Sequence, residues 1–315
     1  MNDEDELLAV RAAELYYQDG KSQAEIAALL DVNRWKVGRA LAAARDHGIV
    51  RIEIIHPRAR RLPLERELRQ AFGLQDAVVV PTSSDEAAGA QRVATAAADF
   101  LAKLRPVPHT LGISWGRTLQ QIAEALPEQW ANGVEVVQIN GGVTVNRRSG
   151  MASATATTIA QKANGTVTLL PSPAILEQAT TRRAIEDDRL VAGILDGARN
   201  ADALIFSVGP VDSSSVLVAG GYMSAAAMSS LAEKGAVGDV LGRYIDADGH
   251  IVDHELDERT LGLTLDDLRN ATTSIVVASG VAKRAACRAV VANRYCSVLV
   301  TDEGTANELL QEARR

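Results

Sequence analysis

A short segment near the middle of the chain combines a hydroxyl, a glycine and a cation in an order that suits anion binding. Residues 110–114 read as a strand, 115–117 as a turn and 118–126 as an amphipathic helix, so a helix begins at this loop. Free backbone N–H groups at a helix N-terminus, with positive charge beside them, suit a phosphate or an ionised carboxylate. The alternative is an ordinary strand-to-helix turn in which glycine only allows close packing. The candidate ligand contacts are Ser114, Trp115, Gly116, Arg117 and Thr118.

A second glycine-rich loop follows another apolar run, at residues 138–142. Asn140 places an amide there, and an amide can both donate to and accept from hydroxyl groups. Gly141 and Gly142 permit a close approach of the backbone to a ligand. The loop therefore suits recognition of a hydroxylated molecule.

Two further blocks each add one charged side chain to this set. Lys283 is one of only six lysines and follows a Ser-Gly pair at the end of an apolar run. This context favours an amine that faces a ligand over a surface lysine on the first turn of a helix. Asp239 lies in the glycine-containing block 238–242 and could accept hydrogen bonds from sugar hydroxyls. Arg243 in the same region is interpreted as an internal ion-pair partner.

Neither a metal nor a cofactor is expected. Segment 246–249 resembles the opening of a calcium loop, but its glycine is misplaced and the terminal glutamate is missing, so a turn is the better interpretation. His250 and His254 lack further ligand-type neighbours and are interpreted as polar loop residues. Cys287 and Cys296 have no metal-like spacing, and two cysteines support neither a zinc site nor a disulfide framework.

The first fifty residues are predicted to form three helices. Residues 5–18 carry an apolar stripe, Ser22 begins a capping box before a short second helix, and Asn33 is a favoured N-cap of a third helix over 34–47. Two helices across a tight turn predict a helix-turn-helix, whose second helix presents its N-terminal residues to base edges in the major groove. Arginine and lysine suit guanine, asparagine suits adenine, and any of them can bind phosphate instead. The predicted DNA contacts are Ser22, Gln23, Asn33, Arg34, Trp35, Lys36 and Arg39.

Charge is distributed unevenly along this region. The chain has a net charge of −7, yet residues 1–32 carry two basic and eight acidic side chains, and residues 33–61 carry eight basic and two acidic ones. Positive charge on one small module supports phosphate contact, and the alternative is a solvated helix face. Val37 and Leu41 are expected to face the core of this module. Trp35 is expected to be partial core rather than a contact to the DNA backbone.

The rest of the chain reads as an α/β domain. Strands that alternate with longer helical patterns imply a largely parallel sheet covered on both faces, with ligands bound outside the carboxyl ends of the strands. We expect a DNA-binding domain over 1–56, a linker helix within 57–74 that joins the domains or pairs with a second copy, and an effector domain over 75–315. Residues 49–55 alternate as a short wing or hinge strand would. The expected strands of the large domain are 77–80, 134–139, 167–170, 203–208, 274–278 and 297–300.

Targeting features are not visible in the sequence. The N-terminus is acidic where a signal peptide would be basic, and no apolar run is long enough to span a bilayer. A cytoplasmic protein without membrane contact is therefore expected.

Several blocks, in order, make the chain similar to the SorC type of sugar-responsive bacterial regulators, which are sometimes grouped with the deoxyribonucleoside regulators. They are LYYQDGKSQAEIAALLDVNRWKVGRALAAARDHGIVRIEI, GISWGRT (112–118), QINGG (138–142), GDVLGRYIDADG (238–249) and ASGVAK (278–283). The resemblance runs from end to end. It implies a winged-helix-like helix-turn-helix domain followed by a doubly wound domain with a sugar-phosphate isomerase or deaminase (NagB/RpiA-like) fold that serves as a sensor.

The resemblance also implies partners and roles. It implies an operator duplex, a small sugar or polyol or its phosphate, and a homo-oligomer, dimer or tetramer, and it assigns Lys283 to the ligand phosphate. In some relatives the position of Asn140 holds a basic side chain, once a lysine that forms an imine with an open-chain sugar. Because asparagine has no amine, covalent capture at this position is excluded and a second phosphate subsite there is disfavoured.

Two other function classes compete with the regulator. An active isomerase or deaminase needs a general base over the reacting carbons. Asp239 is the only carboxylate in a ligand-type glycine block, and the glycine-rich loops contain no histidine. No catalytic residue is therefore assigned, and an enzyme is the alternative interpretation. A helix-turn-helix that binds protein instead of DNA is the least favoured reading, because of the basic stretch 34–61.

Overall fold

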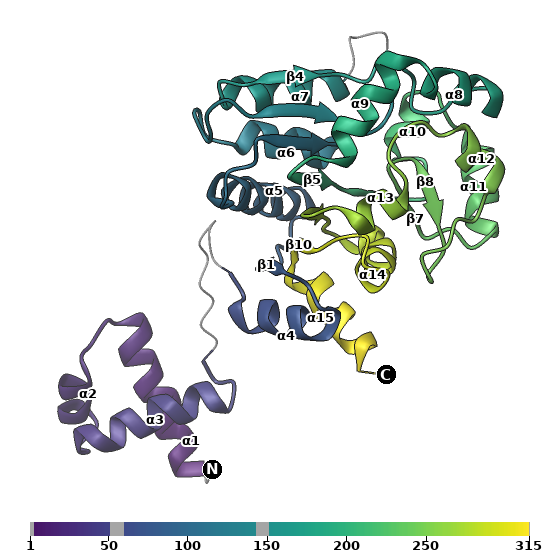
Figure 1. The fold of residues 1–315 in the computed structure, drawn as a ribbon. Coiled ribbons are helices and arrows are strands. Elements are labelled where there is room, and N and C mark those ends of the chain that lie inside the picture. Colours follow the sequence, from purple (N-terminus) through teal and green to yellow (C-terminus); the bar gives the residue numbers. More distant parts are fainter. Residues whose placement is uncertain (1–2, 51–59, 143–150, 315) are drawn as a thin grey trace. The chain divides into compact units, whose positions relative to one another are not determined.

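The computed structural model of the chain describes residues 3–50, 60–142 and 151–314 and divides the chain into two compact units (Figure 1). The smaller unit is Met1–His56 and the larger is Pro57–Arg315. Within the described residues, no helix has the length and apolar character needed to cross a bilayer. Each unit has its own hydrophobic core.

The smaller unit is a three-helix structure. Its elements are α1 (Asp3–Ala13), which continues into a π-helical turn over Glu14–Gln18, α2 (Gln23–Leu29) and α3 (Arg34–Asp46). The hydroxyl of Ser22 accepts from the N–H of Glu25, whose carboxylate in turn accepts from the N–H of Ser22, so the predicted capping box is present.

The core of the small unit is built from small and aliphatic side chains. Val37 and Leu41 are buried as expected, together with Ile26 and with alanines of α1 and α3. The three helices can approach closely because alanine fills little space. The predicted strand over 49–55 lies mostly outside the described residues, and its first two residues, Ile49 and Val50, form no strand.

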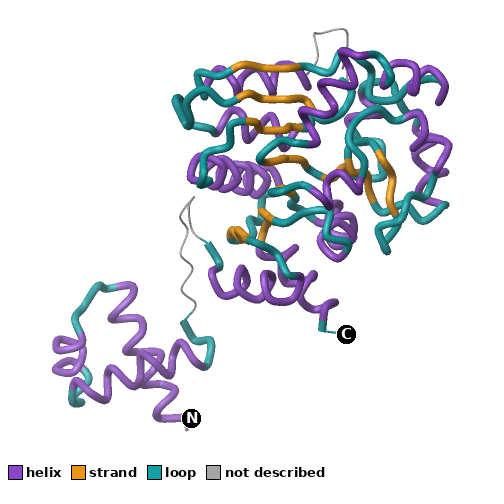
Figure 2. Tube along the Cα trace, in the orientation of Figure 1, coloured by secondary structure: helices purple, strands orange, loops and turns teal. Residues whose placement is uncertain are grey.

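The larger unit contains a seven-stranded sheet in the order β1-β10-β9-β5-β2-β3-β4, with every neighbouring pair parallel. Figure 2 shows the strands in orange among helices in purple. All the expected strands are present within a few residues of their predicted bounds. The expected strand 203–208 is divided, because the sheet strand ends at Phe206 and a separate short strand begins at Val208. The strands are β1 (Asp76–Val80), β2 (Thr110–Ile113), β3 (Glu135–Gln138), β4 (Thr166–Thr168), β5 (Ala203–Phe206), β9 (Ser274–Val277) and β10 (Val298–Asp302).

Helices cover both faces of this sheet, as the predicted doubly wound fold requires. Buried side chains of α5, α6 and α7 pack on one face, and those of α4, α9, α13, α14 and α15 pack on the other. The α/β class expected from the sequence is therefore confirmed. The helix bounds are α4 (Leu62–Phe72), α5 (Glu86–Lys103), α6 (Arg117–Ala125), α7 (Met151–Lys162), α9 (Arg189–Arg199), α13 (Leu265–Asn270), α14 (Arg284–Ala292) and α15 (Glu303–Ala313).

A small antiparallel sheet lies beside the main sheet and was not anticipated. It consists of β6 (Val208–Gly209), β7 (Gly238–Val240) and β8 (Arg243–Ile245). A separate apolar cluster lies beside it, and the cluster includes Trp115 and Tyr244. The helices of this region are α8 (Ala179–Glu186), α10 (Val216–Ala219), α11 (Ala225–Glu233) and α12 (His254–Arg259).

Helix α4, which falls in the segment expected to link the domains, lies within the larger unit. Leu68 is fully buried in the core, and Glu65 is buried and accepts from the N–H of Val79 at 2.9 Å. The helix ends at Gly73, which has φ +68°, a conformation that favours glycine.

Candidate functional site

The loops that follow β2, β5 and β9 meet around a small cavity of about 60 Å³. Its walls are formed by residues 114–118, 207–210 and 215–217, together with Asp239, Leu241 and Lys283. The structure thus brings together all five residues of the first predicted loop with Asp239 and Lys283. A cavity at the carboxyl ends of parallel strands is the expected location for a ligand.

Lys283 connects the loops that line the cavity. Its Nζ donates to Thr118 Oγ1 at 3.0 Å and to Ser207 Oγ at 3.1 Å, so it joins the loops after β2 and β5. Lys283 ends the 3₁₀ turn η2 (Val281–Lys283), which begins after Gly280 at φ +86°. Burial lowers the pKa of Lys283 to about 8, and the charge of Asp239 opposes this shift while that of Arg117 adds to it.

Asp239 lies on β7 with its carboxylate buried, and Oδ2 accepts from the N–H of Gly242 at 2.9 Å. Burial raises the pKa of Asp239 to about 6, although the Gly242 N–H and Lys283 both favour the ionised form. A Cβ at Gly209 would lie 1.9 Å from Asp239 Oδ1, so only glycine at position 209 leaves room for this carboxylate.

The N-terminus of α6 opens toward the same cavity. Gly116 precedes the helix at φ +131°, a conformation nearly restricted to glycine, and among the described residues no side chain caps the first turn. Arg117 is exposed, and its Nη2 donates to the carbonyl of Ser214 at 3.1 Å. Uncapped N–H groups and a guanidinium at one helix end make this place favourable for an anion.

A larger open groove adjoins the cavity. It has a volume of about 750 Å³ and shares Arg117, Thr118 and Lys283 with the cavity. Its other walls come from most of residues 82–90, from Gln121 and Ser214, from residues 279–281 and from Arg284 and Asp302. The shared residues therefore lie between the small cavity and the larger groove.

The second predicted loop lies beside the cavity instead of lining it. Trp115 Nε1 donates to the carbonyl of Gly141 at 2.7 Å, which connects the two loops. Asn140 is fully buried, and neither Oδ1 nor Nδ2 has a hydrogen-bond partner among the described residues. A Cβ at Gly141 would lie 2.2 Å from the carbonyl oxygen of Pro173, so this glycine is required for packing. Gly142 donates to the carbonyl of Ser172 at 2.8 Å.

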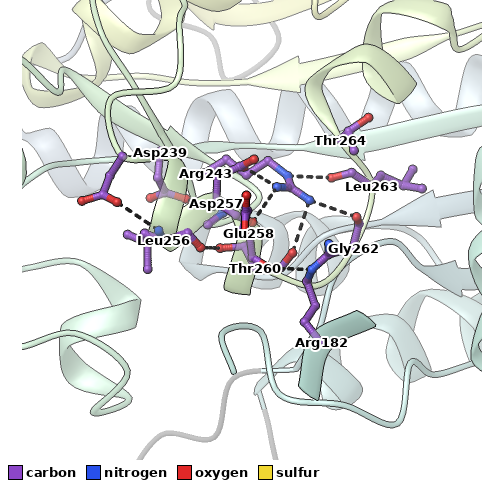
Figure 3. Close-up of polar contacts among 12 residues, drawn as sticks. Arg182, Asp239, Arg243, Leu256, Asp257, Glu258, Thr260, Gly262, Leu263 and Thr264 are labelled. Atoms are coloured by element: carbon purple, nitrogen blue, oxygen red, sulfur yellow. Dashed lines mark hydrogen bonds and ion pairs between the residues drawn. The ribbon is translucent and has the colours of Figure 1, made fainter. Parts of the chain in front are cut away.

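Arg243 is an internal ion-pair partner, as predicted. Its guanidinium is buried, forms an ion pair with Asp257 and donates to the carbonyls of Gly262 and Leu263 (Figure 3). These bonds fasten β8 to the segment after α12. Arg243 therefore supports the strand that pairs with the Asp239 strand, and it does not line the cavity.

Segment 246–249 forms a turn, as interpreted from the sequence. Asp246 Oδ1 accepts from the N–H groups of Asp248 and His250, both at 2.9 Å. One ligand-type atom from each of these three residues lies within 4.8 Å of the others, and Asp248 and His250 are exposed. Cys287 and Cys296 are free thiols buried in the core, and burial raises the pKa of both.

The exposed face of α3 carries the predicted DNA contacts. Arg34, Lys36 and Arg39 are all exposed. Trp35 is 71% exposed, so the expectation that it is partial core is wrong. Its indole instead lies against the guanidinium of Arg39, with Cζ 4.9 Å from the ring centroid, because residues four apart share one helix face.

Two polar residues at the helix-turn-helix have structural tasks. The side chain of Asn33 accepts from the N–H of Lys36 at 2.7 Å and caps α3. Ser22 caps α2. Gln23 lies close to α3, since a Cβ at Gly38 would be 3.7 Å from Gln23 Oε1.

Comparison with known proteins decides the family. Residues 56–311 match the family model described as a sugar-binding domain. The chain belongs to this family. It is 32% identical to the deoxyribonucleoside regulator of Bacillus subtilis over 313 residues, which is 99% of this chain and 100% of that protein. It is 29% identical to the erythritol catabolism regulatory protein EryD of Brucella abortus over 314 residues, which is 98% of each.

Structural similarity extends over the same length. The crystal structure of the full-length sorbitol operon regulator SorC from Klebsiella pneumoniae matches with a TM-score of 0.70 at 29% identity, covering 98% of this chain and 100% of that one. All of these relatives are named as regulators. The chain is accordingly a transcriptional regulator of the sugar-binding domain family, and the resemblance inferred from its sequence is confirmed.

Sequence reasoning missed eight of the residues that line this regulator's cavity, among them Ser207, Gly209 and Ser215. Ser207 and Gly209 follow β5, and a hydroxyl and a glycine directly after a buried strand were an available signal. Ser215, which caps α10, had no local signal, because only the fold brings it beside Asp239.

Proposed function

We propose that this regulator binds a small phosphorylated sugar or polyol at the cavity around Lys283, and that the bound effector alters its affinity for the operator of a carbohydrate or polyol operon. The observation that most supports this is the convergence of Lys283 and Arg117 on the uncapped N-terminus of α6. Asp239 is the sole carboxylate among the described residues that line this cavity, so it balances one of two cations. The other cation remains available to an anionic ligand.

The side chains divide into a phosphate end and a hydroxyl end. Lys283 Nζ, the hydroxyl of Thr118 and the free N–H groups of α6 are donors and suit phosphate oxygens. The hydroxyl of Ser114 and the backbone of Gly116 belong to the same subsite. Asp239 is an acceptor with a pKa near 6, so at neutral pH it is largely ionised and suits sugar hydroxyls.

The volumes of the cavity and of the groove indicate the size of the effector. Binding sites for small molecules usually measure about 300–1,000 Å³. The cavity of about 60 Å³ holds only one end of a sugar phosphate, whereas the groove of about 750 Å³ can hold the rest. We therefore place the effector across Lys283, Thr118 and Arg117, which line both spaces.

Asn140, in the loop beside the cavity, is proposed as a further contact of the effector. Its buried amide has unmet donors and acceptors among the described residues, and a buried amide without partners costs about 1–3 kcal/mol. A ligand hydroxyl or an ordered water beside Gly141 and Gly142 would satisfy it. Trp115 would transmit changes at this loop to the cavity through its bond to the carbonyl of Gly141.

The DNA-binding half is proposed on α3. Arg34 and Lys36 project from its first turn and suit phosphate or guanine. Trp35 holds the guanidinium of Arg39 against its ring, which limits the conformations of Arg39 before it meets a base. Asn33 and Ser22 act through the caps they form, and Gln23 is the α2 residue that faces the duplex.

Regulation is proposed to act between copies of the chain. One recognition helix covers few base pairs, so a dimer or tetramer is needed to read two half-sites. An effector that binds one arrangement of the oligomer more tightly than another shifts the population toward that arrangement. If the two arrangements differ in operator affinity, the effector therefore changes operator binding. We assign 1–56 to DNA binding, 57–74 to the link and 75–315 to the effector, in a cytoplasmic protein.

Thermal unfolding with a panel of compounds tests the effector half. The panel is ribose 5-phosphate, erythritol 4-phosphate and sorbitol 6-phosphate, each beside its unphosphorylated parent. A ligand at one hundred times its Kd stabilises the native state by about 2.7 kcal/mol. We expect this stabilisation from a phosphorylated compound. Lys283→Met should remove the stabilisation. Lys103→Met, which replaces an exposed lysine outside the cavity, should keep it. Stabilisation by none of the compounds, or equal stabilisation of the Lys283 variant, would refute the assignment.

A further inference from the structure

The first turn of α15 contacts the loop that carries Lys283. Asp302 caps this helix, with Oδ1 accepting from the N–H of Thr305 at 2.9 Å. Its other oxygen, Oδ2, accepts from the N–H of Gly280 at 2.9 Å. Gly280 precedes the 3₁₀ turn that ends at Lys283. The position of the helix end is therefore tied to the position of a loop in the proposed effector site.

The same turn contacts the opposite wall of the groove. The N–H of Gly304 donates to Thr82 Oγ1 at 2.9 Å, and Thr82 lies in the loop after β1. Thr82, Gly280 and Asp302 all line the groove. Both walls thus hydrogen-bond to residues 302–304.

The remaining residue of this turn, Glu303, reaches the segment that leads to the small unit. Glu303 Oε2 lies 3.0 Å from Arg61 Nε, an ion pair whose geometry is not that of a hydrogen bond. The N–H of Arg61 donates to the carbonyl of Val79 at 2.8 Å. Arg60 forms an ion pair with the buried Glu65 and also donates to the carbonyl of Ala77.

Residues 60 and 61 therefore hold the start of the larger unit against the outer edge of β1. They are the first described residues after segment 51–59, which continues covalently into the small unit. The outer edge of β1 is an edge of the sheet, and these contacts occupy its free carbonyl groups.

We propose that the first turn of α15 couples the effector groove to the DNA-binding unit, with Asp302 following the Gly280 loop and Glu303 holding Arg61, which lies just after segment 51–59. This rests on the proposed function and specifies its regulation. Asp302 is buried and its carboxylate is fully hydrogen-bonded, so a displacement of Gly280 moves the helix end. Glu303 and Arg61 are positioning residues that touch neither the effector nor the duplex.

The experiment compares Glu303→Gln with a matched control on the same helix. Glu312→Gln removes a similar ion pair, to Arg288 at 2.7 Å, away from the groove. In the full-length chain, effector binding is measured by thermal stabilisation with the panel above. Operator binding is measured with a duplex selected by the wild-type chain from a random-sequence pool, with and without the panel compound that stabilises most. The ratio of the two operator Kd values is the coupling factor.

We expect the wild type to have a coupling factor in the roughly 5- to 150-fold range of allosteric proteins. Glu303→Gln should bind effector and operator as the wild type does, but its coupling factor should fall toward one, the value at which effector has no influence on operator binding. Glu312→Gln should keep the wild-type factor, and the charge-swapped pair Arg61→Glu with Glu303→Arg should recover part of it. Full coupling in Glu303→Gln, equal loss in both single variants, or loss of effector binding in Glu303→Gln would each overturn the proposal. A wild-type factor of one with normal effector stabilisation would refute regulation itself, which is a different failure.

Discussion

Replacement of Asp239 by asparagine should make the free protein more stable while it weakens the response to effector. Asparagine has nearly the same shape and keeps an oxygen that can accept from the N–H of Gly242. It removes a charge that is buried in the cavity wall. Function and stability therefore oppose each other at this position, as expected for a group kept for a ligand.

The size of the expected stabilisation follows from the pKa of Asp239. Burial raises it from 3.8 to about 6, which corresponds to about 3 kcal/mol of native-state destabilisation at pH 7. The attraction to Lys283 is already contained in this pKa, so we expect the variant to be more stable than the wild type by about 3 kcal/mol at pH 7. In a protein of this size that raises the Tm by several degrees.

The pH dependence has a definite sign. Because the native pKa of Asp239 is raised, the wild type loses stability as the pH rises from about 4 through 6, and the variant does not. The stabilisation of the variant relative to the wild type should therefore fall to about half at pH 5. Calorimetric scans of both full-length proteins at pH 7 and pH 5 measure it. A variant less stable than the wild type at pH 7, or a difference that is independent of pH, would refute the reasoning.

Three other variants test separate parts of the account. Gly209→Ala places a Cβ on the Asp239 carboxylate, so it should cost about 1–3 kcal/mol in thermal unfolding and abolish effector stabilisation; an unchanged effector Kd would contradict this. Trp35→Leu should change stability by no more than about 0.5 kcal/mol because the indole is exposed, yet it should weaken operator binding about tenfold in fluorescence anisotropy; normal operator binding would disprove the pairing with Arg39. Arg34→Ala with Lys36→Ala should abolish operator binding and keep effector stabilisation, whereas loss of both would indicate misfolding.

Much of the fold was predictable because its signals are local. Most strands of the parallel sheet are apolar runs rich in β-branched residues, and helical patterns alternate with them, so the α/β class followed from periodicity. Both caps in the helix-turn-helix, at Ser22 and Asn33, were also predicted from residue type and spacing. The small antiparallel sheet was missed because its strands have two or three residues, too few to show alternation.

The site was predictable only where each residue stands in a glycine-rich loop. Ser114 and Lys283 lie in such loops, Asp239 lies next to Gly238 on β7, and all three line one cavity. Ser215 reaches that cavity from a loop without such a signal. Trp35 was misassigned because aromatic residues are usually buried, whereas here alanines from α1 and α3 already fill the space between the helices.

The central claim is that a metabolite bound at Lys283 controls the affinity of α3 for DNA. Titration of the operator duplex tests this claim directly. Operator affinity is measured for the wild type and for Lys283→Met, each with and without the phosphorylated compound that stabilises the wild type most. We predict equal operator Kd values for the two proteins without effector, a changed Kd for the wild type with effector, and no change for the variant. An effector response in Lys283→Met as large as that of the wild type would contradict the account.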